Sequence, residues 1–283
     1  ETPHILMRPE SMPFHAWRAR PRVMPDAHSH TDLELNLPLD GTLHYFFAGR
    51  FIAIGPGSLA VFWAGMPHRL VAVEPAGTEY LCLTLPLAWF LSWGLDSAFT
   101  RRLLSGELAA GDDPLDAALF ARWAADLSGS GADRQEARRV VLLEVEARLR
   151  RLARQGSTGT DGSGPSYGGG ARPQGHSRPV EDVAALVGSR YEDPDLTVAS
   201  LAAELGLHPN YILTIFRNEV GMTLWEYVTR LRVSHAQRLL LTTEWTVARV
   251  AQASGFGSPG RFFAVFKSRC GVTPRQYRVV AVD

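Results

Sequence analysis

Three histidines and one glutamate near the start of the chain have the side-chain types and the spacing of a ligand set. His28 and His30 are separated by one residue, Glu34 follows, and His68 comes later. Successive side chains of a strand alternate between its faces, so a strand through residues 28–34 would point the first three the same way. Imidazole and carboxylate groups bind a divalent transition metal or hydrogen-bond a polar ligand. The spacing therefore predicts that His28, His30 and Glu34 converge inside a barrel.

The same four residues resemble the paired motifs of cupin barrels, in which two histidines, a glutamate and a later histidine bind a metal. The resemblance implies one divalent transition metal, and Fe, Mn, Ni, Cu and Zn all suit these donors. Three positions depart from the cupin pattern, since Arg22, Trp63 and Ala72 replace a glycine, a proline and an asparagine. Three interpretations stay open: the set holds a metal that organises effector binding, it contacts a polar effector directly, or it is hydrogen-bonded within the barrel without a ligand.

Trp63 is a candidate surface for a sugar ring at this site. Sugars present apolar C–H faces to aromatic rings, while their hydroxyl groups bind carboxylates and imidazoles. We therefore include Trp63 with His28, His30, Glu34 and His68 among the predicted effector-binding residues. The alternative is that Trp63 is an ordinary core aromatic.

Glycine and proline residues divide residues 28–87 into short alternating or apolar runs. The clearest runs are 43–47, 51–54, 59–63 and 80–85. This cadence is typical of a small antiparallel β-barrel or sandwich. From residue 114 the apolar period becomes four, which predicts two amphipathic helices. The second of them packs on its own barrel or on a second copy of the chain.

Composition excludes several classes of protein. The chain has 283 residues, 46% of them hydrophobic, with 29 basic and 29 acidic side chains, so we expect neither disorder nor a global attraction to polyanions. Cys82 and Cys270 lie far apart and are expected to be reduced thiols. The apolar stretch at 59–66 is too short to span a membrane, and the first residues lack a leader pattern. We expect a cytoplasmic protein without a membrane partner.

A change of composition divides the chain at residues 156–179, where 17 of 24 residues are glycine, serine, threonine or proline. Such a segment is typical of a flexible linker. We therefore expect an α+β protein with a cupin-like sensor and dimerisation domain at 1–155. Residues 180–283 then form a second, all-α domain.

Residues 197–223 and 246–273 resemble each other. Each copy begins at a threonine that can cap a helix, has a glycine nine residues later, and ends in Gly-x-Thr. This is the pattern of a helix-turn-helix unit, whose second helix can enter a major groove. The helical stretch at 223–242 spans roughly 30 Å, close to the turn of about 34 Å in duplex DNA. One chain is therefore predicted to place two recognition helices in successive major grooves.

Motifs in the second copy identify a family. Ser254-Gly255-Phe256, Phe262-xxx-Phe266-Lys267 and residues 271–278 resemble the DNA-binding domain of the arabinose-regulator (AraC/XylS) family. The resemblance implies a seven-helix, double helix-turn-helix domain that acts at promoter DNA with RNA polymerase. Segments 35–41, 61–70 and 85–96 are similar to the sensor domain of a sugar-operon regulator of this family. This second likeness implies a sugar effector.

On the first recognition helix, predicted at 208–220, three outward residues are candidates for DNA contact. Asn210 and Thr214 are predicted to read base edges, and Arg217 to bind phosphate. The alternative for each is a solvated polar position.

On the second recognition helix Ser258 is the expected N-cap, Arg261 can reach guanine or phosphate, and Lys267 can bind phosphate. All three are predicted DNA-binding residues. Gly260 and Ala264 depart from the family pattern, which usually has a serine at the first position and often a longer polar residue at the second. These departures predict weaker base readout by the second helix.

The leading hypothesis is a sequence-specific transcription regulator, an activator of carbohydrate catabolism that works as a homodimer. A small effector in the barrel would shift the placement of its DNA-binding arms. The alternative is a metal-dependent cupin enzyme with an accessory DNA-binding domain, although the chain offers no separate nucleophile or acid–base set. A constitutive DNA-binding protein with an empty barrel is the third reading.

Overall fold

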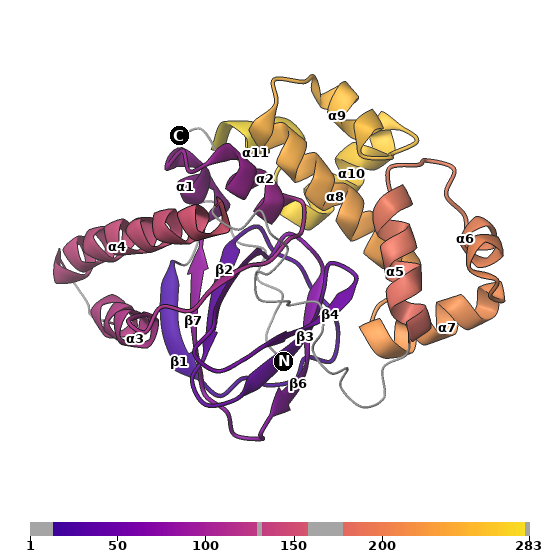
Figure 1. Ribbon diagram of the computed structural model, residues 1–283. Helices are drawn as coiled ribbons and strands as arrows, with labels where there is room; N and C mark the ends of the chain where they lie inside the picture. The colour runs from indigo at the N-terminus through magenta and orange to yellow at the C-terminus, as the bar shows by residue number, and fades with distance from the viewer. Residues whose placement is uncertain (1–13, 129–131, 158–177, 281–283) are drawn as a thin grey trace.

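The computed structural model describes residues 14–128, 132–157 and 178–280. A β-domain with four helices comes first and an entirely helical domain follows, as Figure 1 shows. The strands are β1 (His15–Ala19), β2 (Leu33–Pro38), β3 (Thr42–Phe47), β4 (Arg50–Ile54), β5 (Leu59–Trp63), β6 (His68–Glu74), β7 (Tyr80–Leu85) and β8 (Ala109–Gly111). The helices are α1 (Leu87–Ser92), α2 (Ser97–Leu104), α3 (Asp116–Leu127), α4 (Ala132–Ser157), α5 (Arg178–Arg190), α6 (Val198–Leu205), α7 (Pro209–Val220), α8 (Leu224–Thr242), α9 (Val247–Ala253), α10 (Pro259–Cys270) and α11 (Pro274–Val280).

The strands form two antiparallel sheets, which together make a partly open barrel. The larger sheet has the order β1-β7-β2-β5-β8 and the smaller one β4-β3-β6. Side chains alternate along each strand. Leu35 of β2 packs outward against helices, whereas Glu34 pairs across the ladder with Phe62, which lies in the inner apolar cluster. The predicted antiparallel barrel is confirmed, and the four predicted runs form β3, β4, β5 and β7.

Helices α3 and α4 cover the outer face of the larger sheet. Val141, Val145 and Leu149 of α4 are buried in the same apolar cluster as that face, which confirms the predicted period of four. A buried ion pair joins the two helices, with Arg148 Nε 2.6 Å from Asp116 Oδ1. Helices α1 and α2 were not predicted; they have six and eight residues, too few for an apolar period to repeat.

The sequence repeat forms two helix-turn-helix units, α6–α7 and α9–α10, as predicted. Each unit has a left-handed glycine after its first helix, Gly206 with φ 64° and Gly255 with φ 77°. Glycine adopts this conformation at little cost because it has no Cβ. Thr197 and Thr246 cap the first helix of each unit by accepting a hydrogen bond from a backbone N–H.

Helix α8 is the unbroken spacer that the sequence predicts between the two units. Its 19 residues span about 28 Å. Phe216 and Phe266, one in each unit, are fully buried. Polar residues of α8 are buried as well: the hydroxyl of Ser234 donates to the carbonyl of Gly65 in the β-domain. The spacer helix therefore packs against the barrel and is not surrounded by solvent.

The two domains also share an apolar core. Phe46 and Phe51, on the outer face of the smaller sheet, join one buried cluster with residues of α5, α7 and α8. The ring of Tyr227 on α8 contacts Phe46 and Phe216, with centroids 6.3 and 5.1 Å away. The first helix-turn-helix unit is therefore docked on the barrel, as seen on the right of Figure 1.

Three further sequence predictions concern the chain as a whole. Residues 158–177, most of the predicted linker, lie outside the described residues. Cys82 and Cys270 are both free, as expected for reduced thiols. Among the helices of the described segments, none combines the length and the apolar character needed to cross a membrane.

Candidate functional site

The four predicted ligand residues come together on the inner side of the barrel. One ligand atom from each of His28, His30, Glu34 and His68 lies within 4.8 Å of the others. The predicted strand through residue 28 is wrong in its start, because β2 begins only at Leu33. His28 instead forms an isolated bridge with His68, with backbone N–H···O distances of 2.9 Å in both directions. This bridge holds a loop histidine beside one from β6.

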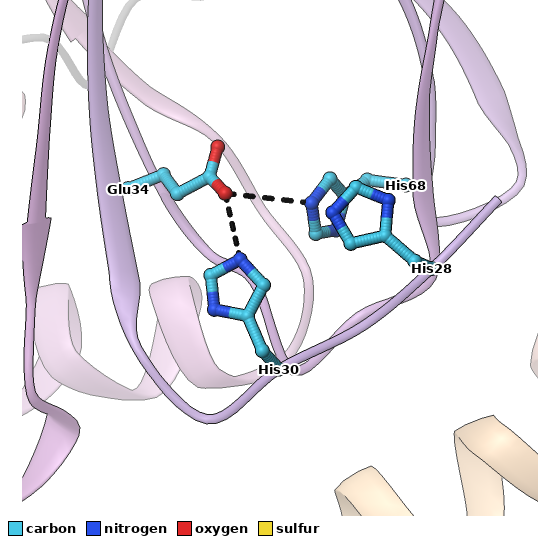
Figure 2. A group of neighbouring side chains, drawn as sticks. All are labelled: His28, His30, Glu34 and His68. Atoms are coloured by element: carbon cyan, nitrogen blue, oxygen red, sulfur yellow. Dashed lines mark hydrogen bonds and ion pairs between the residues drawn. The ribbon is translucent and has the colours of Figure 1, made fainter. Parts of the chain in front are cut away.

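Figure 2 shows the carboxylate of Glu34 between two imidazoles. Nε2 of His30 lies 2.7 Å from Oε1 of Glu34, and Nδ1 lies 3.2 Å from Oδ2 of Asp32. His68 donates from Nδ1 to the carbonyl of Met66 at 2.9 Å, so its Nε2 carries a lone pair in the neutral ring. That Nε2 is buried, lies 3.6 Å from Glu34 Oε1, and has no hydrogen-bond partner within the segments that the structure describes.

Burial and neighbouring charges separate the protonation states of the cluster. Burial, reinforced by the nearby His68 and His30, lowers the pKa of His28 to about 3. Burial also opposes a charge on His30, but its hydrogen bonds to Asp32 and Glu34 outweigh burial and raise its pKa to about 10. Burial opposes a charge on Glu34, but its hydrogen bond with His30 and the nearby His68 outweigh burial and hold its pKa well below the usual value. The cluster thus combines one carboxylate, one imidazolium and a neutral imidazole.

This donor set fits a divalent transition metal. A buried nitrogen without a hydrogen-bond partner, such as Nε2 of His68, is costly unless a ligand satisfies it. Metal-binding histidines usually give their other ring nitrogen to a carboxylate or a carbonyl, as His30 does to Asp32 and His68 does to Met66. A polar effector could satisfy the same nitrogen with a hydroxyl group.

The structure does not bring Trp63 to this cluster. Trp63 is fully buried in the outer apolar cluster with the helices, and its Nε1 donates to the carbonyl of Thr31 at 3.3 Å. Its neighbour Phe62 faces inward instead, with its ring centroid 5.5 Å from that of His68. The prediction of Trp63 as a sugar-stacking residue is therefore not supported, and the core alternative describes its position. The period of two along β5 accounts for the difference.

Two polar residues beside the cluster were missed. Asn36 is fully buried two residues after Glu34, donates from Nδ2 to Glu34 Oε2 at 3.1 Å, and has no hydrogen-bond partner for Oδ1 among the described residues. The two-residue period of a strand could have identified Asn36, because Asn36 and Glu34 lie on the same face of β2. Asp32, which holds His30, precedes the strand, so no periodicity marks it.

The predicted DNA-contact residues of the first unit lie exposed on α7. Asn210, Thr214 and Arg217 face solvent, while Ile212 and Phe216 are buried. The hydroxyl of Thr214 donates to the carbonyl of Asn210 at 2.8 Å, so its oxygen is left to accept a hydrogen bond from a base or from water.

The second unit has a similar surface on α10. Ser258 caps the helix by accepting from the backbone N–H of Arg261 at 3.3 Å, as predicted. Arg261 and Lys267 are exposed. Two aromatic side chains are also exposed on the recognition helices: Phe263 on α10 (43%) and Tyr211 on α7 (44%). Apolar surface of this kind can contact thymine methyl groups in a major groove.

A sensor-type barrel with a ligand cluster, followed by a seven-helix domain with two exposed recognition helices, defines a two-domain transcriptional regulator. Comparison with known families agrees: the AraC-like ligand binding domain matches residues 12–153, and a helix-turn-helix domain matches residues 201–279. The chain therefore belongs to the AraC family of transcriptional regulators. It has an effector-binding domain and a DNA-binding domain.

Two known proteins are similar over most of the chain, and a solved structure is similar over about a third of it. The melibiose operon regulatory protein of Escherichia coli is 27% identical over 261 residues, which is 91% of this chain and 85% of that protein. The transcriptional activator NphR of a Rhodococcus species is 26% identical over 86% of this chain and 68% of that protein. Among solved structures, the C-terminal domain of AraT, a response regulator from Geobacillus stearothermophilus, is 30% identical over 36% of this chain and 85% of that chain, with a TM-score of 0.36.

Proposed function

We propose that this regulator activates genes of carbohydrate catabolism in the cytoplasm when a sugar binds in its barrel. The observation that carries the proposal is the convergence of His28, His30, Glu34 and His68 on the inner side of a barrel that is joined to two exposed recognition helices. The similarity to the melibiose operon regulatory protein supports a sugar as the effector class. Asn36, with its unpartnered buried carbonyl oxygen, offers a further group for a sugar hydroxyl.

The proposal includes a divalent transition metal in the barrel. His28, His30, Glu34 and His68 would hold it. When bound, the metal would supply a Lewis-acidic centre for effector hydroxyl groups. Asp32 and the Met66 carbonyl orient two of the imidazoles, and metal binding would have to displace the proton held by His30.

A homodimer is proposed through α4. Val140 and Leu143 are 43% and 67% exposed on this helix, although both are large and apolar. A second copy of the chain would remove that surface from water. A dimer bound at a promoter is also the form in which we expect contact with RNA polymerase.

Changing His68→Ala tests the proposal and separates it from an enzyme. Melibiose is the first probe, in a reporter assay with the target promoter and in binding assays with purified protein. A regulator should lose induction and keep its basal DNA affinity within about twofold, because His68 is fully buried in the barrel and is not part of the exposed faces of α7 and α10. Cobalt(II) titration of both proteins, followed by visible absorption, should show binding only in the unchanged protein.

The matched control is His208→Ala, which alters a histidine that caps α7 outside the barrel. Its cobalt affinity should equal that of the unchanged protein. Undiminished induction in His68→Ala would refute the effector site. Turnover of a sugar that disappears in His68→Ala while DNA regulation persists would favour the enzyme alternative.

A further inference from the structure

The segment at residues 24–30 belongs to both domains at once. His28 and His30 supply ligand groups to the barrel cluster. The residues between and before them contact the helical domain: the N–H of Ala27 donates to the carbonyl of Val220 at 3.2 Å, and Ser29 accepts from Arg230 at 3.1 Å. A ligand that moves the two histidines therefore moves groups that touch the DNA-binding domain.

One set of contacts holds the end of the first recognition helix, α7. Arg69 of β6 donates from Nη1 to the carbonyl of Glu219 and from Nε to the carbonyl of Met24, both at 2.8 Å. Gly221 ends α7 with φ 82°, and a Cβ there would lie 2.6 Å from the carbonyl oxygen of Pro25. The end of α7 thus rests directly on residues 24–27, without room for a side chain.

A second set of contacts leads to the other recognition helix, α10. Arg230 of α8 donates from Nη1 to Ser29 and from Nη2 to Glu226 Oε1 at 3.0 Å. The same Glu226 oxygen lies 3.4 Å from Nη2 of Arg269, in the last turn of α10. A chain of polar contacts therefore runs from Ser29 through Arg230 and Glu226 to Arg269.

Arg230 is poorly satisfied in this position. Its side chain is only 12% exposed, and its Nε is buried without a hydrogen-bond partner in the described part of the chain. It donates to Ser29, the residue that stands between His28 and His30. A cation held by the two histidines would repel this guanidinium, whose partly buried position limits screening by water.

We infer that Arg230 is the positioning residue through which the barrel site controls the second recognition helix. The inference rests on the proposed function, in which the cluster binds a ligand. A divalent cation at the cluster weakens the hold of Arg230 on Ser29 and changes how Glu226 is shared between Arg230 and Arg269. Helix α7 stays docked through Arg69, so the two recognition helices change their relative placement.

The test uses the full chain, Co²⁺ alone as the ligand, and two DNA probes. One probe carries the bipartite site, and the other carries only the half-site read by α7. In the unchanged protein Co²⁺ should change the affinity for the bipartite probe about 5- to 150-fold, the usual range of allosteric coupling, and leave the half-site affinity within about twofold. Fluorescence anisotropy measures both affinities, and visible absorption measures Co²⁺ binding.

Arg230→Met should bind Co²⁺ at least as tightly as the unchanged protein, because the repelling guanidinium is gone, and should lose the Co²⁺ effect on the bipartite probe. Arg230→Lys, which keeps the charge, should retain part of it. The matched control is Arg190→Met, because Arg190 forms ion pairs with Asp193 and Glu204 inside the helical domain. That variant should keep the full Co²⁺ effect.

Should Arg230→Met fail to fold, Ser29→Ala breaks the same contact from the barrel side and should give the same loss. A Co²⁺ effect of unchanged size in a folded Arg230→Met or Ser29→Ala variant would overturn the inference. Co²⁺ binding without any change in DNA affinity of the unchanged protein would overturn it and leave the metal site standing. Absence of Co²⁺ binding would overturn the inference and the metal site together.

Discussion

Asn210 and Arg217 are both exposed on α7, yet they should contribute to DNA binding in different ways. An asparagine can bond adenine through two hydrogen bonds, so Asn210→Ala should relax the preference at one base pair by about 1–3 kcal/mol.

A phosphate contact carries no sequence information, so Arg217→Ala should weaken binding to all sequences and reduce the salt dependence by about one unit of log–log slope. Binding titrations at several salt concentrations, against a set of single-base operator variants, measure both effects.

Lys267→Ala is the counterpart on α10, where Lys267 is also exposed. It should reduce the salt slope as Arg217→Ala does, without altering base preference. Equal slopes in variant and unchanged protein would remove that residue from the DNA contacts. An unaltered base preference in Asn210→Ala would assign Asn210 to the helix surface alone.

At the residue scale, types and spacing could predict the ligand cluster but not every member of the site. His28, His30, Glu34 and His68 were identified because their side-chain chemistry is distinctive. Trp63 was misassigned because its chemistry was considered without its strand parity, which places it on the outer face. Asn36 lies on the same face of the strand as Glu34, but an asparagine near ligand residues does not by itself indicate a site residue when only the sequence is known.

At the scale of elements, α8 carries a buried histidine that should make stability depend on pH. His235 has a side chain only 7% exposed; its ring lies against Tyr191, and its Nδ1 lies 3.0 Å from Oε1 of the exposed Glu192. Burial, with a smaller effect of Arg238, lowers its pKa to about 4. Between pH 6.5 and 4 the unfolded chain therefore binds a proton that the folded chain does not. Stability from this group is complete above pH 6.5 and falls with decreasing pH, by about 3 kcal/mol at pH 4.

His235→Gln should flatten this part of the pH dependence, as measured by urea unfolding between pH 4 and 7. His208→Gln is the control, because His208 is exposed at the start of α7. That change should lower stability through the lost helix cap and leaves the buried His235 in place. A slope in His235→Gln equal to that of the unchanged protein would contradict a neutral buried His235.

The elements themselves follow closely from the sequence. Apolar periods of two and four mark the main strands and helices, and threonine caps with a glycine nine residues later mark both helix-turn-helix units. Where periodicity is short, as in α1 and α2, sequence patterns predict nothing. The start of β2 was placed too early, because a loop that pairs with β6 through a single bridge has the same alternation as a strand.

At the scale of the whole molecule, the contact between the two domains could not be predicted from sequence patterns. The contact joins Phe46 of the barrel with Tyr227 of α8, and Arg69 with the end of α7. The same residues would also be ordinary in a structure with separate domains, because half-buried aromatic side chains and exposed arginines are common on protein surfaces. Periodicity reports which face of an element is buried, and not which element buries it.

The docked, continuous α8 leads to a prediction for operator architecture. Because its 19 residues span about 28 Å between the two units, one chain should require two half-sites about one helical turn apart. Inserting five base pairs between them turns the half-sites to opposite faces of the duplex. Affinity should then fall about 10²- to 10⁴-fold, to that of a single half-site, since the gain from linked binding is lost.

Inserting ten base pairs distinguishes a rigid spacer from a flexible one. The half-sites return to the same face but lie about twice as far apart, beyond the span of α8. A spacer buried between the barrel and both helix-turn-helix units cannot lengthen without breaking those contacts, so affinity should stay at the level of a single half-site. Gel-shift titration of the three duplexes measures this directly, and recovery with the ten-base-pair insertion would show that the spacer bends or unwinds on DNA.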